Sequence, residues 1–279
     1  MFRQVRFLRR KLYRLYTNLR QEFMLSESCI VQKLHLTRNG TLGTFSPDDI
    51  LGATIAILYR HRISEDDVKK LAENYLHVKE QQRRHKFKYL QRRDSFTIGR
   101  LAAKIALKKH LDDVPPNDIF IGSGLFNQPI ILGASYRLCE LGVSISHSDQ
   151  LGVAIVHHKG HPIGIDVDQL AQTDVVPVLD AMDARLKEQF VKLSLSEYEA
   201  ASLVWVACES LGKVLITGMM VPLSIYAPSS IVRCGAGFEL RYKNFKQYQT
   251  RVMPFADAWL AITFPGQTDM DLSWVVSGK

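Results

Sequence analysis

The chain has 279 residues, of which 46% are hydrophobic and 23% charged, and it carries a formal net charge of +8. A chain of this length buries a substantial core, as one two-lobed domain or as two small ones. It has no apolar run of about 18 residues, and its basic N-terminus lacks the apolar region of a secretion signal. We therefore expect a cytoplasmic protein without stable membrane insertion.

The positive charge lies in two basic stretches. Residues 1–20 contain seven basic side chains and no acid, and residues 79–109 contain eleven Lys or Arg against Glu80 and Asp94. Such stretches attract phosphates, acidic proteins, nucleic acid or anionic lipid, and charge alone does not choose among these partners. The four cysteines are scattered and lack zinc-ligand spacing, which favours reduced thiols.

Hydrophobic periodicity predicts a mixture of helices and strands. Residues 1–20 have the pattern of a basic amphipathic helix, and residues 30–36 that of a short strand. Ser46 and Ser64 are each typical helix N-caps, because acids follow them in the first turn. The remaining expected elements are a helix over 94–110, strands within 143–147, 153–155 and 163–168, a long helix over 195–217, and strands over 238–242, 250–253 and 259–264.

An internal similarity indicates two related halves. Residues 149–155 read DQLGVAI and residues 257–263 read DAWLAIT, and helices precede strands on both sides of residue 166. We predict an α+β fold with halves at 71–165 and 166–279, preceded by a basic, helical N-terminal extension over residues 1–70.

Two acidic segments stand 43 residues apart. Asp166 and Asp168 are two positions apart on an expected strand, so they project to one face. Trp205, Glu209 and Lys213 are four apart on the expected long helix, so they share a face as well. If the two faces meet, three carboxylates converge, which suits Mg²⁺ with a substrate phosphate. The alternative is an acidic pair at a strand end and a separate surface Glu/Lys pair.

The order of these segments resembles the signature of the 4'-phosphopantetheinyl transferases, and most closely their large, pseudo-dimeric monomeric class. The matching segments are Arg92 to Arg100, Asn127-Gln128-Pro129, Val143-Ser-Ile-Ser-His147-Ser, Gly164-Ile-Asp166-Val-Asp168 and Trp205-x-x-x-Glu209-Ser-x-x-Lys213. The resemblance covers roughly residues 76–265. It implies two α+β halves related by pseudo-twofold symmetry and a monomer.

The resemblance also implies a role for each matching residue. Mg²⁺ would be held by Asp166, Asp168 and Glu209 against the pyrophosphate of coenzyme A (CoA), the co-substrate. The 3'-phosphate of CoA would be bound by His147, in its Ser146-His147 segment, with Lys79 and Arg83. The adenine would lie near Ser95, Phe96, Gln128 and Pro129. Lys213 would contact the phosphoryl group under attack, and Glu209 is the candidate base.

The implied reaction moves phosphopantetheine from CoA to a serine of an acyl or peptidyl carrier protein, in polyketide or nonribosomal peptide biosynthesis. Two residues depart from the family pattern. Asp168 is one methylene shorter than the glutamate often found there, and Cys208 stands where the family has Lys or Arg. Because Cys208 removes the positive charge of that Lys or Arg, one alternative to a transferase is a protein that binds CoA or a carrier without transfer. Since all three carboxylates and Lys213 remain, we expect activity.

Other motifs are assigned no chemistry. A nucleic-acid-binding protein that uses the basic stretches is a further alternative, but it lacks a recognisable motif with interleaved aromatics, and we expect no nucleic acid as partner. His157, His158 and His161 are expected in a solvated hairpin tip rather than in a metal cluster. Cys208 beside Glu209 is expected to be an inert, packed thiol. The extension over residues 1–70 is expected to cap the fold or to dock a partner.

Overall fold

The computed structural model describes residues 24–34, 36–38, 51–133 and 135–277. The helix expected over 1–20 and the N-cap expected at Ser46 lie outside these residues. The helices are α3 (Glu65–Tyr75), α4 (Val78–Lys86), α5 (Leu90–Leu111), α6 (Tyr136–Cys139), α7 (Val175–Asp180), α8 (Ala184–Lys192), α9 (Glu197–Leu215), α10 (Leu223–Tyr226) and α11 (Ser273–Ser277), with single 3-10 turns at Arg60–Arg62, Pro116–Asp118 and Gln172–Asp174. No described helix is long and apolar enough to cross a membrane.

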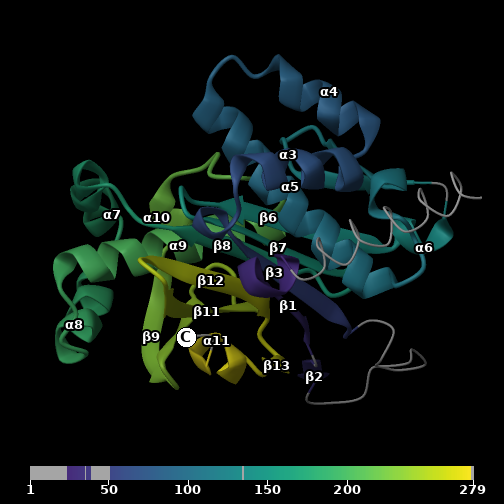
Figure 1. Cartoon of the computed structure of the whole chain (residues 1–279). Helices are drawn as coiled ribbons and strands as arrows, with labels where there is room; N and C mark the ends of the chain where they lie inside the picture. The colour runs from purple at the N-terminus through teal and green to yellow at the C-terminus, as the bar shows by residue number, and fades with distance from the viewer. Residues whose placement is uncertain (1–23, 35, 39–50, 134, 278–279) are drawn as a thin grey trace, which may run out of the picture.

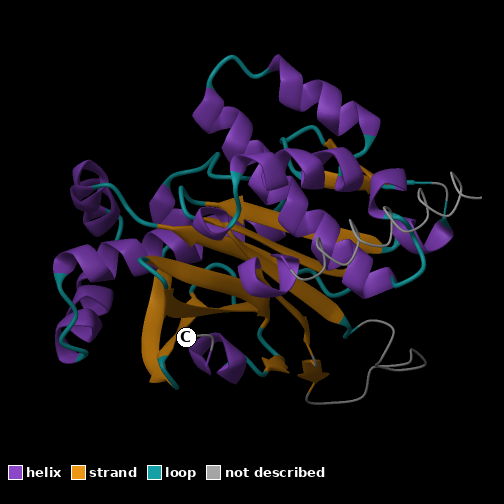
Figure 2. Ribbon diagram, viewed as in Figure 1, coloured by secondary structure: helices purple, strands orange, loops and turns teal. Residues whose placement is uncertain are grey.

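The strands form two main antiparallel sheets (Figures 1 and 2). The first has the order β1-β3-β7-β6, from β1 (Cys29–Leu34), β3 (Ala53–Tyr59), β7 (Leu151–His158) and β6 (Leu141–His147). The second has the order β8-β12-β11-β10-β9, from β8 (Gly164–Asp168), β12 (Ala258–Pro265), β11 (Tyr248–Phe255), β10 (Gly237–Tyr242) and β9 (Pro228–Cys234). Two short pairs join β2 (Leu36–Arg38) to β13 (Thr268–Met270) and β4 (Phe120–Ser123) to β5 (Pro129–Leu132).

Three apolar clusters hold these layers together. In the first, Leu101 and Ile105 of α5 pack with Val156 of β7. The second lies between the sheets, where Ile155 of the first sheet packs with Ile262 of the second. The third joins α7, α8 and α9 to the second sheet. The sheets therefore share one core, and each has a long helix on its other face, α5 on the first and α9 on the second.

The long helix α9 lies within the predicted range of 195–217 and is two residues shorter at each end. Ser196 is the N-cap and accepts from the backbone N–H of Glu199, whose carboxylate accepts in return from the backbone N–H of Ser196. This capping box satisfies two of the otherwise unpaired backbone donors at the helix start. The helix ends at Leu215, and its C-cap, Ile216, is in the left-handed conformation. Glu209 and Lys213 therefore stand in its last two turns.

The structure confirms most expected elements and corrects several boundaries. Residues 29–34 and 53–59, which were placed in the N-terminal extension, form β1 and β3 of the first sheet. Helix α5 begins at Leu90 rather than near Asp94. The prediction that residues 157–162 form a solvated hairpin tip is wrong for His157 and His161. Strand β7 continues through His158, and both His157 and His161 are buried.

Candidate active site

The two aspartates of strand β8 point toward α9, and its apolar residues point into the core between the sheets. Ile165 and Val167 belong to that core, whereas Asp166 lies opposite Ala261 of β12, which packs in the cluster under α9. Alternation along a strand forces this division. The prediction that Asp166 and Asp168 share a face is therefore confirmed, and that face is the one covered by α9.

A glycine lets α9 approach β8 closely. The Ser210 hydroxyl donates to the backbone oxygen of Gly164 at 3.0 Å. A Cβ atom on Gly164 would overlap the carbonyl oxygen of Ser210 and would lie 2.8 Å from Cγ2 of Val214. The absence of a side chain at position 164 thus sets the separation at which residues 209 and 213 face Asp166.

We expect Gly164→Ala to push α9 away from β8. Overpacking of this kind costs about 1–3 kcal/mol, and the displacement should lower activity more than tenfold, since a shift of about 1 Å can cost about 10²-fold. Denaturant unfolding and turnover measure the two effects. Ser210→Ala is the matched control, because it removes the hydrogen bond without adding bulk. Equal turnover in Gly164→Ala and wild type would show that the close approach does not matter.

The Asp166 carboxylate is buried and held on one oxygen only. Its Oδ1 accepts from the Ser146 hydroxyl at 2.6 Å and from Nζ of Lys213 at 2.6 Å. The same ammonium donates to the backbone oxygen of Ile165 at 3.1 Å. The other oxygen, Oδ2, is buried and has no hydrogen-bond partner among the described residues. A bare carboxylate oxygen in a buried position is costly, which suggests that another group binds there.

The other two carboxylates are close enough to repel Asp166. Burial is the main factor that raises the pKa of Glu209, followed by the charge of Asp166, while Lys213 opposes the rise. Burial likewise raises the pKa of Asp168, whose Oδ2 accepts from the indole N–H of Trp205 at 3.0 Å. The face of β8 with Asp166 and Asp168 therefore meets the face of α9 with Glu209. The charge of each of these three carboxylates affects the ionisation of the others.

The carboxylates fit a hard cation in part. Within the described ranges, no three His, Cys, Asp or Glu side chains already form a metal-ligand set. Asp168 is engaged by Trp205 and by the backbone N–H of Gln169, and Lys213 stands against Asp166. The unpartnered Oδ2 of Asp166 and the raised pKa of Glu209 are the features that a cation would relieve. Mg²⁺ needs only one or two protein carboxylates when waters and phosphate complete its shell.

Basic and aromatic side chains gather between α4, the start of α5 and β4. The Lys79 ammonium lies 5.3 Å from the ring centre of Phe120. Arg83 donates to the Ser123 hydroxyl at 2.7 Å, and its guanidinium carbon lies 5.4 Å from the ring centre of Phe96. A second guanidinium, that of Arg100, lies at the same distance from this ring. Phe96 and Phe120 are half-buried and Arg100 is buried, whereas Lys79 and Arg83 are exposed, so cations and aromatic rings lie together here in a way that suits a phosphate and a base.

The turn between β4 and β5 carries two further predicted residues. Pro129 begins β5 and pairs with Ser123, the residue that Arg83 contacts. The Gln128 side chain accepts from the backbone N–H of Phe126 at 2.9 Å and so shapes the turn. Lys79, Arg83 and Phe96 are thus brought together with Pro129. The role of Gln128 in the structure is to hold the turn.

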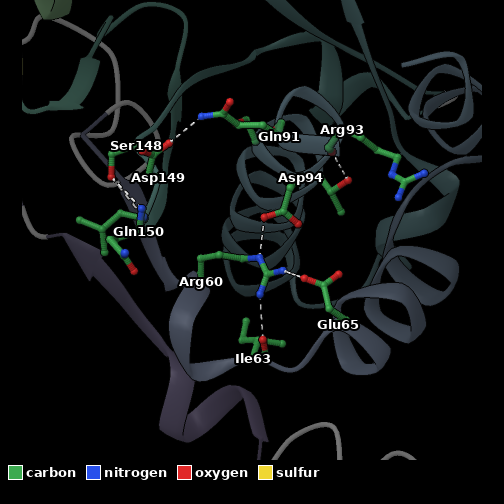
Figure 3. Close-up of polar contacts among 12 residues, drawn as sticks. Arg60, Ile63, Glu65, Gln91, Arg93, Asp94, Ser148, Asp149 and Gln150 are labelled. Carbon is green, nitrogen blue, oxygen red and sulfur yellow. Dashed lines mark hydrogen bonds and ion pairs between the residues drawn. The ribbon is translucent and has the colours of Figure 1, made fainter. Parts of the chain in front are cut away.

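Ser95 of α5 and Ser148, which follows β6, line a small pocket of about 60 Å³, and Figure 3 shows the polar contacts around it. The pocket is lined by Arg60, Gln91, Asp94, Ser95, Ile98, Ser148 and Asp149. Arg60 fastens its walls together. Its Nε donates to Asp94 at 2.6 Å, and its backbone N–H donates to Gln150 at 2.8 Å. This arginine was not predicted, because it lies outside the segments that carry the resemblance.

His147 lies close enough to Lys213, Arg92 and Asp166 for their charges to act on its ring. Its side chain is exposed at the end of β6, yet enough protein surrounds the ring to lower its pKa, and the charges of Lys213 and Arg92 lower it further. The neighbouring Ser146 points to the other side and contacts Asp166. Ser144, which sequence reasoning missed, accepts from the backbone N–H of Ile165 at 3.0 Å. Serine hydroxyls therefore join β6 to β8.

Cys208 is fully buried among the apolar side chains under α9, which agrees with an inert thiol. Burial raises its pKa, and the charge of Glu209 adds to the rise. A lysine at this position would be an unpaired buried cation in this structure.

We expect Cys208→Ala to keep turnover within about threefold of wild type and to cost about 1 kcal/mol of stability, a typical value for one substitution. Cys208→Lys introduces a basic residue at this position, as in the family that the sequence resembles, but should cost about 3–5 kcal/mol, the range seen when a buried charge has no partner. Denaturant unfolding compares the two variants. A Cys208→Lys protein as stable as wild type would contradict the buried position.

No protein-family model matches the sequence, and no curated protein matches it. Two of the solved structures to which it is similar are holo-acyl-carrier-protein synthases. One is the holo-(acyl-carrier-protein) synthase of Bacillus anthracis str. Ames in complex with CoA (3',5'-ADP), at 30% identity over 37% of this chain and 90% of that chain, with a TM-score of 0.32. Another is that of Thermotoga maritima, at 21% identity over 43% and 68%, with a TM-score of 0.28. At these TM-scores the likeness does not establish a shared fold.

Proposed function

We propose that the protein transfers the 4'-phosphopantetheine group of CoA to a serine of an acyl or peptidyl carrier protein. The observation that carries the proposal is the convergence of Asp166, Asp168 and Glu209 with Lys213 at the contact between β8 and α9. These are the residues that the sequence resemblance names. The basic and aromatic group around Arg83 and Phe96 supports a nucleotide phosphate as the second ligand.

In the proposed reaction the carrier serine oxygen attacks the phosphorus that bears the pantetheine arm. A phosphorus–oxygen bond forms to serine, the pyrophosphate bond breaks, and adenosine 3',5'-bisphosphate leaves. Glu209 accepts the serine proton, and its raised pKa makes it a better base than an ordinary glutamate. Lys213 neutralises charge on the phosphoryl oxygens, while Lys79, Arg83 and His147 bind the 3'-phosphate.

The site would hold Mg²⁺ through Asp166 and Glu209, with Asp168 nearby. When bound, the ion would neutralise the negative charge of the pyrophosphate, a main requirement of phosphoryl transfer. Within the protein, Ser146 keeps Asp166 in place and Trp205 orients Asp168. The donors are all hard oxygens, which is the donor type that Mg²⁺ prefers.

The same proposal includes two α+β halves related by pseudo-twofold symmetry. Each long helix packs on the strand that contains one copy of the sequence similarity. Helix α5 packs on β7, and α9 packs on β12. We propose a single chain that forms both halves of the site, acting as a monomer.

Release of adenosine 3',5'-bisphosphate from CoA tests the proposal. It should require the protein, Mg²⁺ and an apo-carrier, and it should stop when the carrier serine is changed to alanine. Mg²⁺-dependent CoA binding without release would favour the second candidate, binding without transfer, for which the contact between Lys213 and Asp166 is the supporting observation. Affinity for oligonucleotides in the absence of CoA binding would favour the nucleic-acid alternative.

A further inference from the structure

The position of Lys213 has a cost for metal binding. Its ammonium lies 2.6 Å from Oδ1 of Asp166 and 3.1 Å from the backbone oxygen of Ile165, so it is hydrogen-bonded to two residues of β8. Three ionised carboxylates and one ammonium leave a charge of about −2 at the site. A divalent cation would balance that charge, but it would also stand close to the ammonium on the same carboxylate. The two cations therefore compete.

Asp166 is built to exchange one partner and keep the other. The Ser146 hydroxyl comes from β6, a strand of the other sheet, and holds Oδ1 independently of α9. The Lys213 side chain is flexible and still 25% exposed, whereas that of Asp166 is 6% exposed. When the ammonium moves away, the carboxylate keeps its anchor. Its other oxygen, Oδ2, is buried and has no hydrogen-bond partner among the described residues.

We propose that Lys213 is an internal placeholder cation that couples the binding of metal and CoA. This inference rests on the proposed function. In the protein without ligands the ammonium occupies Asp166 and weakens metal binding. The pyrophosphate of CoA attracts the ammonium away from β8 and so opens the carboxylate to the metal. By linkage, the metal must strengthen CoA binding by the same factor.

The test uses Mn²⁺ as the metal probe, with free Mn²⁺ measured by electron paramagnetic resonance at pH 7.5. In the absence of CoA, Lys213→Met should bind Mn²⁺ about tenfold more tightly than wild type, a coupling of ordinary size. CoA should tighten Mn²⁺ binding in wild type, and the tightening should be about tenfold smaller in the variant. Lys213→Gln should behave like Lys213→Met, which provides a second folded variant without the charge.

Two further variants serve as controls. Lys192→Met removes an exposed lysine of α8 and should leave Mn²⁺ binding unchanged. Ser146→Ala removes the anchor and should weaken Mn²⁺ binding by a similar factor with and without CoA. The proposed role of Lys213 as a placeholder is overturned if, in the absence of CoA, both Lys213 variants bind Mn²⁺ no more tightly than wild type. CoA that fails to bind wild type under any condition overturns the proposed function instead, and the Mn²⁺ measurement without CoA still decides on the placeholder.

Discussion

Glu209→Gln is expected to slow transfer by about 10²–10⁴-fold, the range that general base catalysis supplies. The amide has nearly the shape of the carboxylate, so the packing of α9 on β8 is retained. What is lost is the proton acceptor and one negative oxygen facing Asp166. Turnover at saturating CoA and carrier measures the effect.

The same substitution should not destabilise the protein at pH 7.5, which separates a functional from a structural role. The pKa of Glu209 is raised in the folded state by burial and by Asp166, so its ionised form costs folding free energy above that pKa. Removal of the charge should keep or raise the melting temperature at pH 7.5. The difference should shrink as the pH falls through the raised pKa toward the ordinary value of about 4.3.

Glu197→Gln is the matched control, because Glu197 is exposed in the first turn of the same helix. It should leave both turnover and melting temperature near wild type. A Glu209→Gln protein that labels the carrier as fast as wild type would contradict the assigned role. One that is inactive and also unfolds early would show that Glu209 has a structural role.

Lys104→Met is expected to cost about 3–5 kcal/mol of folding free energy, the range seen when one partner of a buried pair is removed. Lys104 is fully buried on α5, and its ammonium lies 2.8 Å from Oε2 of Glu80 on α4. It also donates to the backbone oxygens of Pro116 and Ile119. The pair therefore fastens α4 and the segment before β4 to α5.

The experiment is a double-mutant cycle read by denaturant unfolding. Glu80→Leu combined with Lys104→Met should recover most of the loss, since an apolar pair of similar volume replaces a buried ion pair at little cost. Lys109→Met, an exposed position on the same helix, should change stability by less than about 0.5 kcal/mol. If Lys104→Met were as mild as Lys109→Met, the pair would not hold α4. Lys79 and Arg83 stand on α4, so CoA affinity should fall in the single variant as well.

The two periodicities of the sequence predicted which side chains share a face. A period of two put Asp166 beside Asp168, and a period near four put Glu209 beside Lys213. That the faces meet depends on contacts between distant segments. The small size of Gly164 and the hydroxyl of Ser210 set the approach of α9 to β8. Neither residue carries a periodic signal, so spacing alone left the alternative of two separate pairs open.

The sequence pattern did not predict the contact that Ser146 makes or which basic residues are buried, because both depend on tertiary packing. Ser146 was assigned to CoA from its motif, and its hydroxyl in the structure holds Asp166. Only the packing of β6 against β8, which belong to different sheets, brings these residues together. The basic stretch over 79–109 likewise contains both buried and exposed basic side chains. Lys104 and Arg100 are buried, whereas Lys79 and Arg83 are exposed, and charge counting treats all four alike.

Covalent transfer of phosphopantetheine to the carrier is tested most directly by intact mass spectrometry of the carrier. The protein is incubated with CoA, Mg²⁺ and several apo-carriers of the peptidyl and acyl types. We predict that at least one carrier gains the mass of one phosphopantetheine on its serine, and that Glu209→Gln slows the gain. Binding of CoA with no added mass on any carrier, at every metal concentration tried, would contradict the account.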